Sequence, residues 1–151
     1  MIPSVWMATA DDLAAAALLL DRFNREYDEP TPGPQRLKAR LELLVEQGDA
    51  VLLGGEGPDG IALLRFRPAV WSEGLESYLA ELYVVPERRG RGLGRALLEK
   101  AIELARERGA DTMDLGTSED DVVARALYEK LGFINREGAD GAITYFYERE
   151  L

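Results

Sequence analysis

The apolar and polar positions of this chain follow two repeats in turn. Segments in which apolar residues alternate with polar ones predict strands, and segments in which they recur every three or four positions predict helices. The clearest helical segment covers residues 91–108, where apolar residues recur every four positions from Leu93 to Ala105 and Gly109 supplies a stop. The chain is therefore expected to contain both helices and strands.

The complete pattern predicts four helices and seven strands. The predicted helices cover residues 10–27, 34–47, 91–108 and 118–131, of which the last opens with the capping sequence S-x-x-D. The predicted strands cover residues 4–9, 50–54, 61–67, 75–85, 112–117, 133–137 and 145–150. The order β-α-α-β-β-β-α-β-α-β-β predicts one mixed α+β domain over residues 1–151, with a strand–loop–helix crossover in its middle.

Composition narrows the chemistry that this domain can perform. The chain has 151 residues and contains neither histidine nor cysteine. Disulfides, thiol nucleophiles, Cys-ligated zinc and Ser-His dyads are therefore excluded, and no metal site is expected. Acid–base catalysis would fall to carboxylates, tyrosine, lysine or water.

Charge is distributed unevenly. The net charge is −10, yet residues 87–108 carry seven basic and four acidic side chains, a local +3. The acidic total argues against a nucleic-acid partner, while the basic segment suggests an anionic ligand. The apolar run at residues 13–20 is too short to span a bilayer and follows two aspartates, so neither a membrane span nor a signal peptide is expected. A cytoplasmic location is the simplest expectation.

The densest chemical signal is the run VVPERRGRGLGRALL at residues 84–98. A strand ends at a proline, and a helix begins among three glycines and four arginines. Glycine lets backbone N–H groups approach an anion, and a helix N-terminus adds about half a positive charge. Phosphate or pyrophosphate is the expected ligand, although the spacing matches neither a dinucleotide-binding fingerprint nor a Walker loop.

Two motifs in this chain resemble a known family. The first is R-x-x-G-x-G at Arg89, Gly92 and Gly94, and it resembles the acetyl-CoA-binding signature of the GNAT family of N-acetyltransferases. The second is A-x-x-x-Y-x-x-x-G-F, which begins at Ala124 and contains Tyr128. The resemblance implies the GNAT-like fold over nearly the whole chain, with a central, mixed and mostly antiparallel sheet flanked by helices.

The resemblance also implies a donor site for acetyl-CoA as cosubstrate. The residues implied at the CoA pyrophosphate, mainly through backbone amides, are Arg89, Gly90, Arg91, Gly92, Leu93, Gly94 and Arg95. The strand edge at Leu82, Tyr83 and Val84 would hydrogen-bond the pantetheine. Many family members carry asparagine at Asp121; this carboxylate either contacts the cofactor or caps its helix, and capping is favoured because a carboxylate is a poor neighbour for a polyphosphate.

Two residues are catalytic candidates. Glu81 lies just before the implied pantetheine edge, where the family often places a glutamate, and either Glu81 or a water relay would take the proton of the acceptor amine. Tyr128 would protonate the thiolate leaving group, because a phenol keeps its proton at neutral pH. A backbone N–H near Leu82 or Tyr83 would polarise the thioester carbonyl.

The acceptor is less well defined. Aromatic and acidic residues occur together where the family builds its acceptor pocket, at Phe23, Tyr27, Asp28, Glu29, Trp71, Glu73, Glu76 and Tyr78. They would suit the primary amine of a cationic metabolite, an antibiotic or a peptide. The alternative is a non-catalytic acyl-CoA-binding regulatory module, and a phosphate-binding interaction domain is disfavoured by the two failed fingerprints. The family resemblance is compatible with a homodimer, but no sequence feature identifies an interface.

Overall fold

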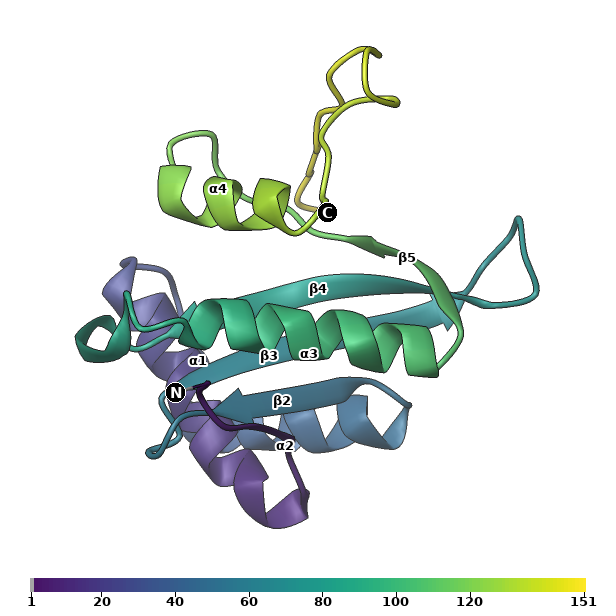
Figure 1. The fold of residues 1–151 in the computed structure, drawn as a ribbon. Coiled ribbons are helices and arrows are strands. Elements are labelled where there is room, and N and C mark those ends of the chain that lie inside the picture. The colour runs from purple at the N-terminus through teal and green to yellow at the C-terminus, as the bar shows by residue number, and fades with distance from the viewer. Residues whose placement is uncertain (1) are drawn as a thin grey trace. The chain divides into compact units, whose positions relative to one another are not determined.

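The computed structural model describes residues 2–151, which divide into two compact units on either side of the peptide bond between Leu115 and Gly116 (Figure 1). The first unit contains a five-stranded sheet in the order β1-β2-β3-β4-β5. Its strands are β1 (Val5–Met7), β2 (Ala50–Gly54), β3 (Gly60–Pro68), β4 (Leu75–Val84) and β5 (Ala110–Asp114). Neighbouring strands are antiparallel except for β4 and β5, which run parallel, so the predicted mixed and mostly antiparallel sheet is confirmed.

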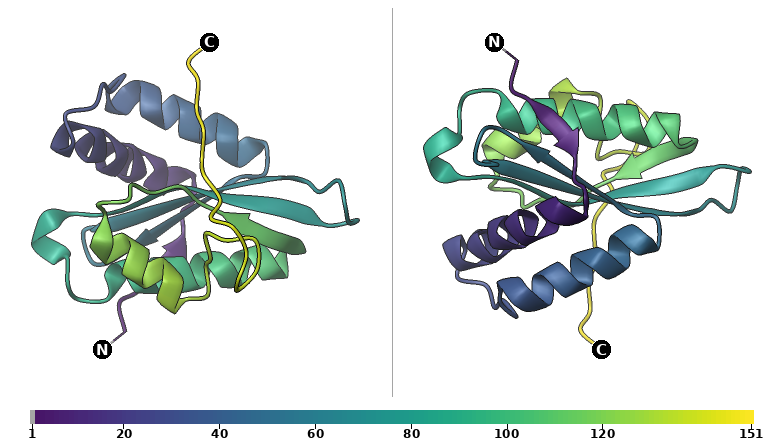
Figure 2. Two further views of the ribbon diagram at one scale, coloured as in Figure 1. Left: turned by 90° about the horizontal axis from the view of Figure 1, so that it is seen from above. Right: turned by 90° about the horizontal axis from the view of Figure 1, so that it is seen from below.

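Three helices cover the two faces of this sheet. The helices α1 (Leu13–Glu26) and α2 (Pro34–Glu46) lie on one face, and α3 (Leu93–Glu107) lies on the other (Figure 2). A short 3₁₀ turn over Ala10–Asp12 precedes α1, and Thr9 and Asp12 form a reciprocal capping box there. Because helices cover both faces, all five residues of β2 are buried.

The core of the first unit follows from the sequence pattern. On the side of α1 and α2, Leu53 and Ile61 pack with Leu13, Ala17 and Leu41. On the side of α3, the residues Leu93, Leu97, Leu98, Ala101 and Ala105 are buried, which is the helical stripe seen in the sequence. Predicted and observed bounds of the helices and strands in this unit agree within about three residues. The largest shift of a whole element is that of β5, which is predicted over residues 112–117 and covers Ala110–Asp114. It ends there because Asp114 is the last of its residues that pairs with β4.

The second unit contains one helix, α4 (Val122–Lys130). The predicted start at Ser118 is wrong, because the residue before the helix is Asp121, whose carboxylate accepts the N–H of Ala124 (3.4 Å). The helix ends in a Schellman motif: Phe133 donates its N–H to the carbonyl of Tyr128 (3.0 Å) and Gly132, at φ +94°, donates to Glu129 (3.1 Å).

The two strands predicted at residues 133–137 and 145–150 are not formed. This segment holds a single bridge between Arg136 and Ile143, flanked by the hydrogen bonds Glu137 to Ala142 and Thr144 to Asn135. An isolated hairpin is marginal without a third strand or a helix against which to bury one face. Among the described residues of the second unit there is no third strand, and the side chains of residues 145–147 are exposed, so the segment does not bury one face and forms no regular strand pairing.

Among residues 2–151, no helix combines the length and the apolar character that crossing a membrane requires.

Candidate functional site

The glycine-rich loop and the start of α3 leave a row of backbone donors without partners. The chain leaves β4 at Val84, makes a 3₁₀ turn over Pro86–Arg88 and enters α3 after Gly92. Across residues 2–151, the N–H groups of residues 90–95 find no acceptor, and the first helical bond of α3 is that from Ala96 to Gly92 (3.0 Å). Six consecutive donors are therefore available to a ligand.

Glycine is required at Gly92 by its backbone conformation. Its φ is +85°, a left-handed value, and Gly90 has φ +76°. A Cβ added at Gly92 would meet no atom within 4 Å, so the conformation and not crowding excludes other residues. Two left-handed residues separated by one other residue favour a loop in which successive N–H groups turn toward one side and can hold an anion. Gly92 also has no side chain with which to cap α3 itself.

The four arginines of this loop are not equivalent. Three have a carboxylate partner, in the pairs Arg88 with Asp59 (3.9 Å), Arg89 with Glu26 (2.8 Å) and Arg95 with Glu99 (2.8 Å). Arg91 forms no ion pair or side-chain hydrogen bond with any other residue of the range 2–151. Within residues 2–151, Arg91 is therefore the one arginine of the four whose guanidinium has no protein partner.

The edge of β4 is open next to this loop. β5 pairs with β4 only from Leu75 to Tyr78, so residues 79–84 have no neighbouring strand on that side within the first unit. The Val85 N–H donates to the backbone carbonyl of Asp59 (2.9 Å), on the side of β4 that faces β3. Backbone groups of successive residues in a strand point to alternate sides, so those of Tyr83 also face β3. The backbone groups of Leu82 and Val84 therefore face the open edge. An extended ligand could therefore pair with Leu82.

A β-bulge lies within this edge, just before Glu81. Leu63 pairs with Glu81 while Leu64 pairs with Leu79, so Ala80 is the extra residue of β4. Bulges interrupt pairing and redirect side chains, and they recur next to functional sites. Here the bulge sets the side chain of Glu81 on the face that α1 and α2 cover, together with Leu63 and Tyr83.

Glu81 is half-buried and has no partner. Among the described residues, none donates a hydrogen bond or an ion pair to its carboxylate. Burial raises the pKa of Glu81 above its ordinary value, because the carboxylate form loses hydration that nothing replaces. A carboxyl group with a raised pKa is a stronger base than an exposed one.

The remaining predicted site residues, Asp121 and Tyr128, belong to the second unit. Asp121 caps α4 and also accepts a hydrogen bond from Thr117 (3.4 Å). It caps the helix as the residue directly before the first turn, and not as the fourth residue of the predicted box that begins at Ser118, and its contact with the cofactor stays a prediction. Burial, and then the negative charge of Asp121, raise the pKa of Tyr128. The Tyr128 ring packs edge-on against Phe133 (centroids 6.0 Å apart), which is the hydrophobic contact of the Schellman motif.

The suggested acceptor residues fall into separate groups. At the end of α1, the Phe23 ring stacks on the Tyr83 ring (centroids 4.7 Å apart) and packs edge-on against the Tyr27 ring (centroids 5.5 Å apart). Asp28 and Glu29 follow next along the chain. The loop between β3 and β4 carries Trp71, which is 96% exposed, and Glu73, while Glu76 pairs with Arg67. Tyr83 lies seven positions after Glu76 on β4, a distance of about 23 Å at the usual rise of a strand. The residues at the end of α1 lie nearer to Glu81.

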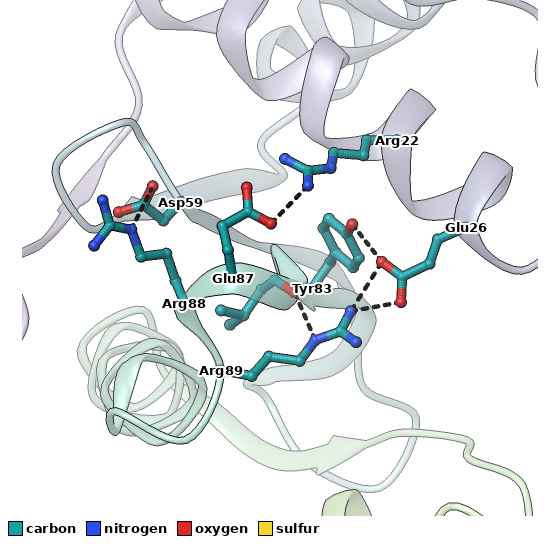
Figure 3. A network of polar contacts seen from close by, with 8 residues as sticks. Arg22, Glu26, Asp59, Tyr83, Glu87, Arg88 and Arg89 are labelled. Atoms are coloured by element: carbon teal, nitrogen blue, oxygen red, sulfur yellow. Dashed lines mark hydrogen bonds and ion pairs between the residues drawn. The ribbon is translucent and has the colours of Figure 1, made fainter.

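One functional candidate has no signal in the sequence. Glu26 accepts hydrogen bonds from Tyr83 and Arg89 (Figure 3), which lie 57 and 63 residues further along the chain. No motif or spacing links residues so far apart, so only the folded structure identifies this contact. The described residues contain no cluster of three or more acidic side chains that could hold a metal ion.

Comparison with known proteins agrees with this arrangement. Residues 14–133 match the family described as the acetyltransferase (GNAT) family. The chain is 43% identical to an acetyltransferase-like protein of Arthrobacter sp. FB24, whose crystal structure superposes with a TM-score of 0.89 over 100% of this chain and 96% of the other.

Two curated relatives carry more specific names. A thialysine N-epsilon-acetyltransferase of Caenorhabditis elegans is 26% identical over 136 residues, which cover 90% of this chain and 84% of that protein. A mycothiol acetyltransferase of Beutenbergia cavernae is 40% identical over 96 residues, which cover 62% of this chain but only 28% of the relative. The family match covers most of the chain and contains both motifs, and we conclude that the chain belongs to the acetyltransferase (GNAT) family of N-acetyltransferase enzymes.

Proposed function

We propose that this protein transfers the acetyl group of acetyl-CoA directly to a primary amine. The observation that carries the proposal is the row of six unpaired N–H groups at residues 90–95 beside the open edge of β4. A pyrophosphate is a strong acceptor for consecutive amides at a helix N-terminus, and a pantetheine amide can pair with a strand edge. Acetyl-CoA carries both groups in one molecule.

The parts of the donor then have separate binding groups. The amides of residues 90–95 and the guanidinium of Arg91 hold the pyrophosphate. The backbone of Leu82 pairs with the pantetheine, while the Val84 carbonyl already accepts from Arg89 Nε (2.9 Å). This arrangement directs the thioester along β4 toward Glu81.

The reaction needs a proton acceptor and a proton donor. An alkylamine is mostly protonated at neutral pH, so Glu81, directly or through water, removes one proton from the ammonium group. The amine nitrogen then attacks the thioester carbonyl, so that a C–N bond forms and the C–S bond breaks. The second proton of the amine passes through water to the Tyr128 phenolate that is left when the CoA thiolate is protonated, and the proton on Glu81 is released to solvent. The thiolate of CoA takes a proton from Tyr128, whose raised pKa keeps the phenol protonated at neutral pH.

We propose a cationic amine as the acceptor. Phe23 and Tyr27 provide aromatic faces on the side of the sheet where Glu81 lies, and the net charge of −10 favours approach of a cation. The relative named for the ε-nitrogen of thialysine is consistent with an amine acceptor. Polyamines, aminoglycosides, lysine-like metabolites and peptide amino termini all fit this class. The proposal includes one domain over residues 1–151, a cytoplasmic location and a homodimer, which rest on sequence and family resemblance.

The first test separates this proposal from a non-catalytic acyl-CoA-binding module. Calorimetry with acetyl-CoA is expected to show one site, and release of free thiol is expected with at least one member of a panel of cationic amines. Binding without thiol release on any amine would favour the non-catalytic module. The absence of binding would contradict both.

A Glu81→Gln substitution tests the base. The value of kcat/KM in the native protein should fall as pH falls through the raised pKa of Glu81, because the protonated carboxyl cannot accept a proton. In the variant this acidic limb should disappear and kcat should fall about 10²-fold. Glu107→Gln, at an exposed position at the C-terminal end of α3, is the matched control. An unchanged pH–rate profile in Glu81→Gln would remove this residue from the mechanism.

A Tyr128→Phe substitution tests the acid. Loss of the phenol hydroxyl should lower kcat by about 10²-fold, while the Kd of acetyl-CoA changes far less, since the ring contact with Phe133 is kept. Tyr147→Phe, at an 88% exposed tyrosine, should leave both values unchanged. Near-native turnover in Tyr128→Phe would show that another group or water protonates the thiolate.

A further inference from the structure

A carboxylate on α1 holds the loop that carries the unpaired amides. Glu26, the last residue of α1, accepts a hydrogen bond from the Tyr83 hydroxyl (2.7 Å). Both of its oxygens also accept from Nη2 of Arg89, at 3.0 and 2.8 Å (Figure 3). Arg89 Nε donates to the carbonyl of Val84 (2.9 Å). One guanidinium therefore joins the end of α1 to the end of β4.

This contact lies directly beside the proposed pyrophosphate site. Arg89 immediately precedes Gly90, the first of the six residues with an unpaired N–H. Holding the Arg89 side chain at both Glu26 and Val84 fixes where the loop leaves the 3₁₀ turn. It also occupies the Val84 carbonyl on the open edge of β4, so the free pairing groups of that edge are those of Leu82. The contact thus acts on both halves of the donor site.

The surroundings favour a charged Glu26. Its side chain is 24% exposed, and Arg89 also lies over the Tyr83 ring (5.6 Å to the centroid). Burial alone would raise the pKa of Glu26, but the hydrogen bonds from Tyr83 and Arg89 outweigh it and hold that pKa below its ordinary value. Burial and the bond to Glu26 raise the pKa of Tyr83 to about 12. At neutral pH the network therefore consists of a carboxylate, a guanidinium and a neutral phenol.

The same region contains an ion pair suited to serve as a control. Arg22 of α1 pairs with Glu87 of the 3₁₀ turn (2.7 Å), so it too joins α1 to the loop. Both of its side chains are about half exposed, at 49% and 56%. Within residues 2–151, neither side chain forms a hydrogen bond with a backbone carbonyl of β4, whereas Arg89 does. Exposed pairs of this kind contribute little free energy.

We propose that Glu26 is a positioning residue of the acetyl-donor site, which holds Arg89 and thereby sets the amides of residues 90–95 and the end of the β4 edge in the geometry that binds acetyl-CoA. The proposal rests on the proposed function. Glu26 need not touch the donor. Its loss should therefore weaken donor binding while leaving the chemical step and the acceptor site nearly unchanged.

The test compares Glu26→Gln with Glu87→Gln. Glutamine keeps the size of the side chain and can still accept from Tyr83, but it removes the charge that holds Arg89. Glu26→Gln should raise the Kd of acetyl-CoA about 10-fold, the usual effect of losing a charge-assisted hydrogen bond. At saturating donor, kcat and the KM of the acceptor should stay within about 3-fold of native. Glu87→Gln should change the Kd less than 2-fold, and Glu26→Asp should restore part of the lost affinity.

A ligand-free measurement separates this inference from the proposed function. The backbone amide resonances of Gly90, Gly92 and Gly94 should shift in Glu26→Gln without acetyl-CoA present, and should shift little in Glu87→Gln. Shifted resonances in a protein that binds no acetyl-CoA in its native form would contradict the proposed function alone. Native acetyl-CoA binding with an unchanged Kd and unchanged resonances in Glu26→Gln would overturn the role of Glu26. Thermal unfolding of each variant shows whether a change in Kd reflects general destabilisation.

Discussion

The unsatisfied N-terminus of α3 is the constraint on which the functional site depends. The first turn of any helix leaves its N–H groups without intrahelical acceptors, and a serine, threonine or aspartate cap usually satisfies some of them. Here the capping position is Gly92, which has no side chain, and the left-handed residues of the loop extend the row of free donors back to Gly90. The first unit therefore presents concentrated positive potential at one place, although the chain as a whole is acidic.

β4 connects this anion site to the proposed chemistry. Its pairing with β5 stops at Tyr78, which leaves an edge that an extended ligand can continue, and its bulge at Ala80 precedes Glu81. The carboxylate of Glu81 is half-buried and has no partner among residues 2–151, so its raised pKa arises from burial on the face that α1 and α2 cover. The early end of the β5 pairing thus leaves an edge of β4 open to the proposed ligand. The helices that cover one face of the same strand raise the pKa of the proposed base, Glu81.

The sequence predicted local features well and distant contacts poorly. The bounds of α3 follow from an apolar stripe that ends at Gly109, and the Gly132–Phe133 stop follows from neighbours in the chain, so both could be read from the pattern. The strands predicted after Phe133 did not form, because alternation predicts a strand only if a partner buries one face. Glu26 and Arg89 lie far apart in the chain, and only the packing of α1 against β4 brings them into contact. The burial of Glu81 depends on the same packing. The single domain over residues 1–151 stays a prediction.

The central claim, that the amides of residues 90–95 bind the pyrophosphate of the donor, is tested most directly by NMR. Titration of ¹⁵N-labelled protein with acetyl-CoA should shift the amide resonances of Gly90, Gly92 and Gly94 more than those of Gly48 and Gly109, which lie at the other end of α3. An acetylated pantetheine that lacks the pyrophosphate should leave the three resonances nearly unmoved while still affecting Leu82. Equal shifts with both compounds, or no shift of the three glycines at saturating acetyl-CoA, would contradict the account.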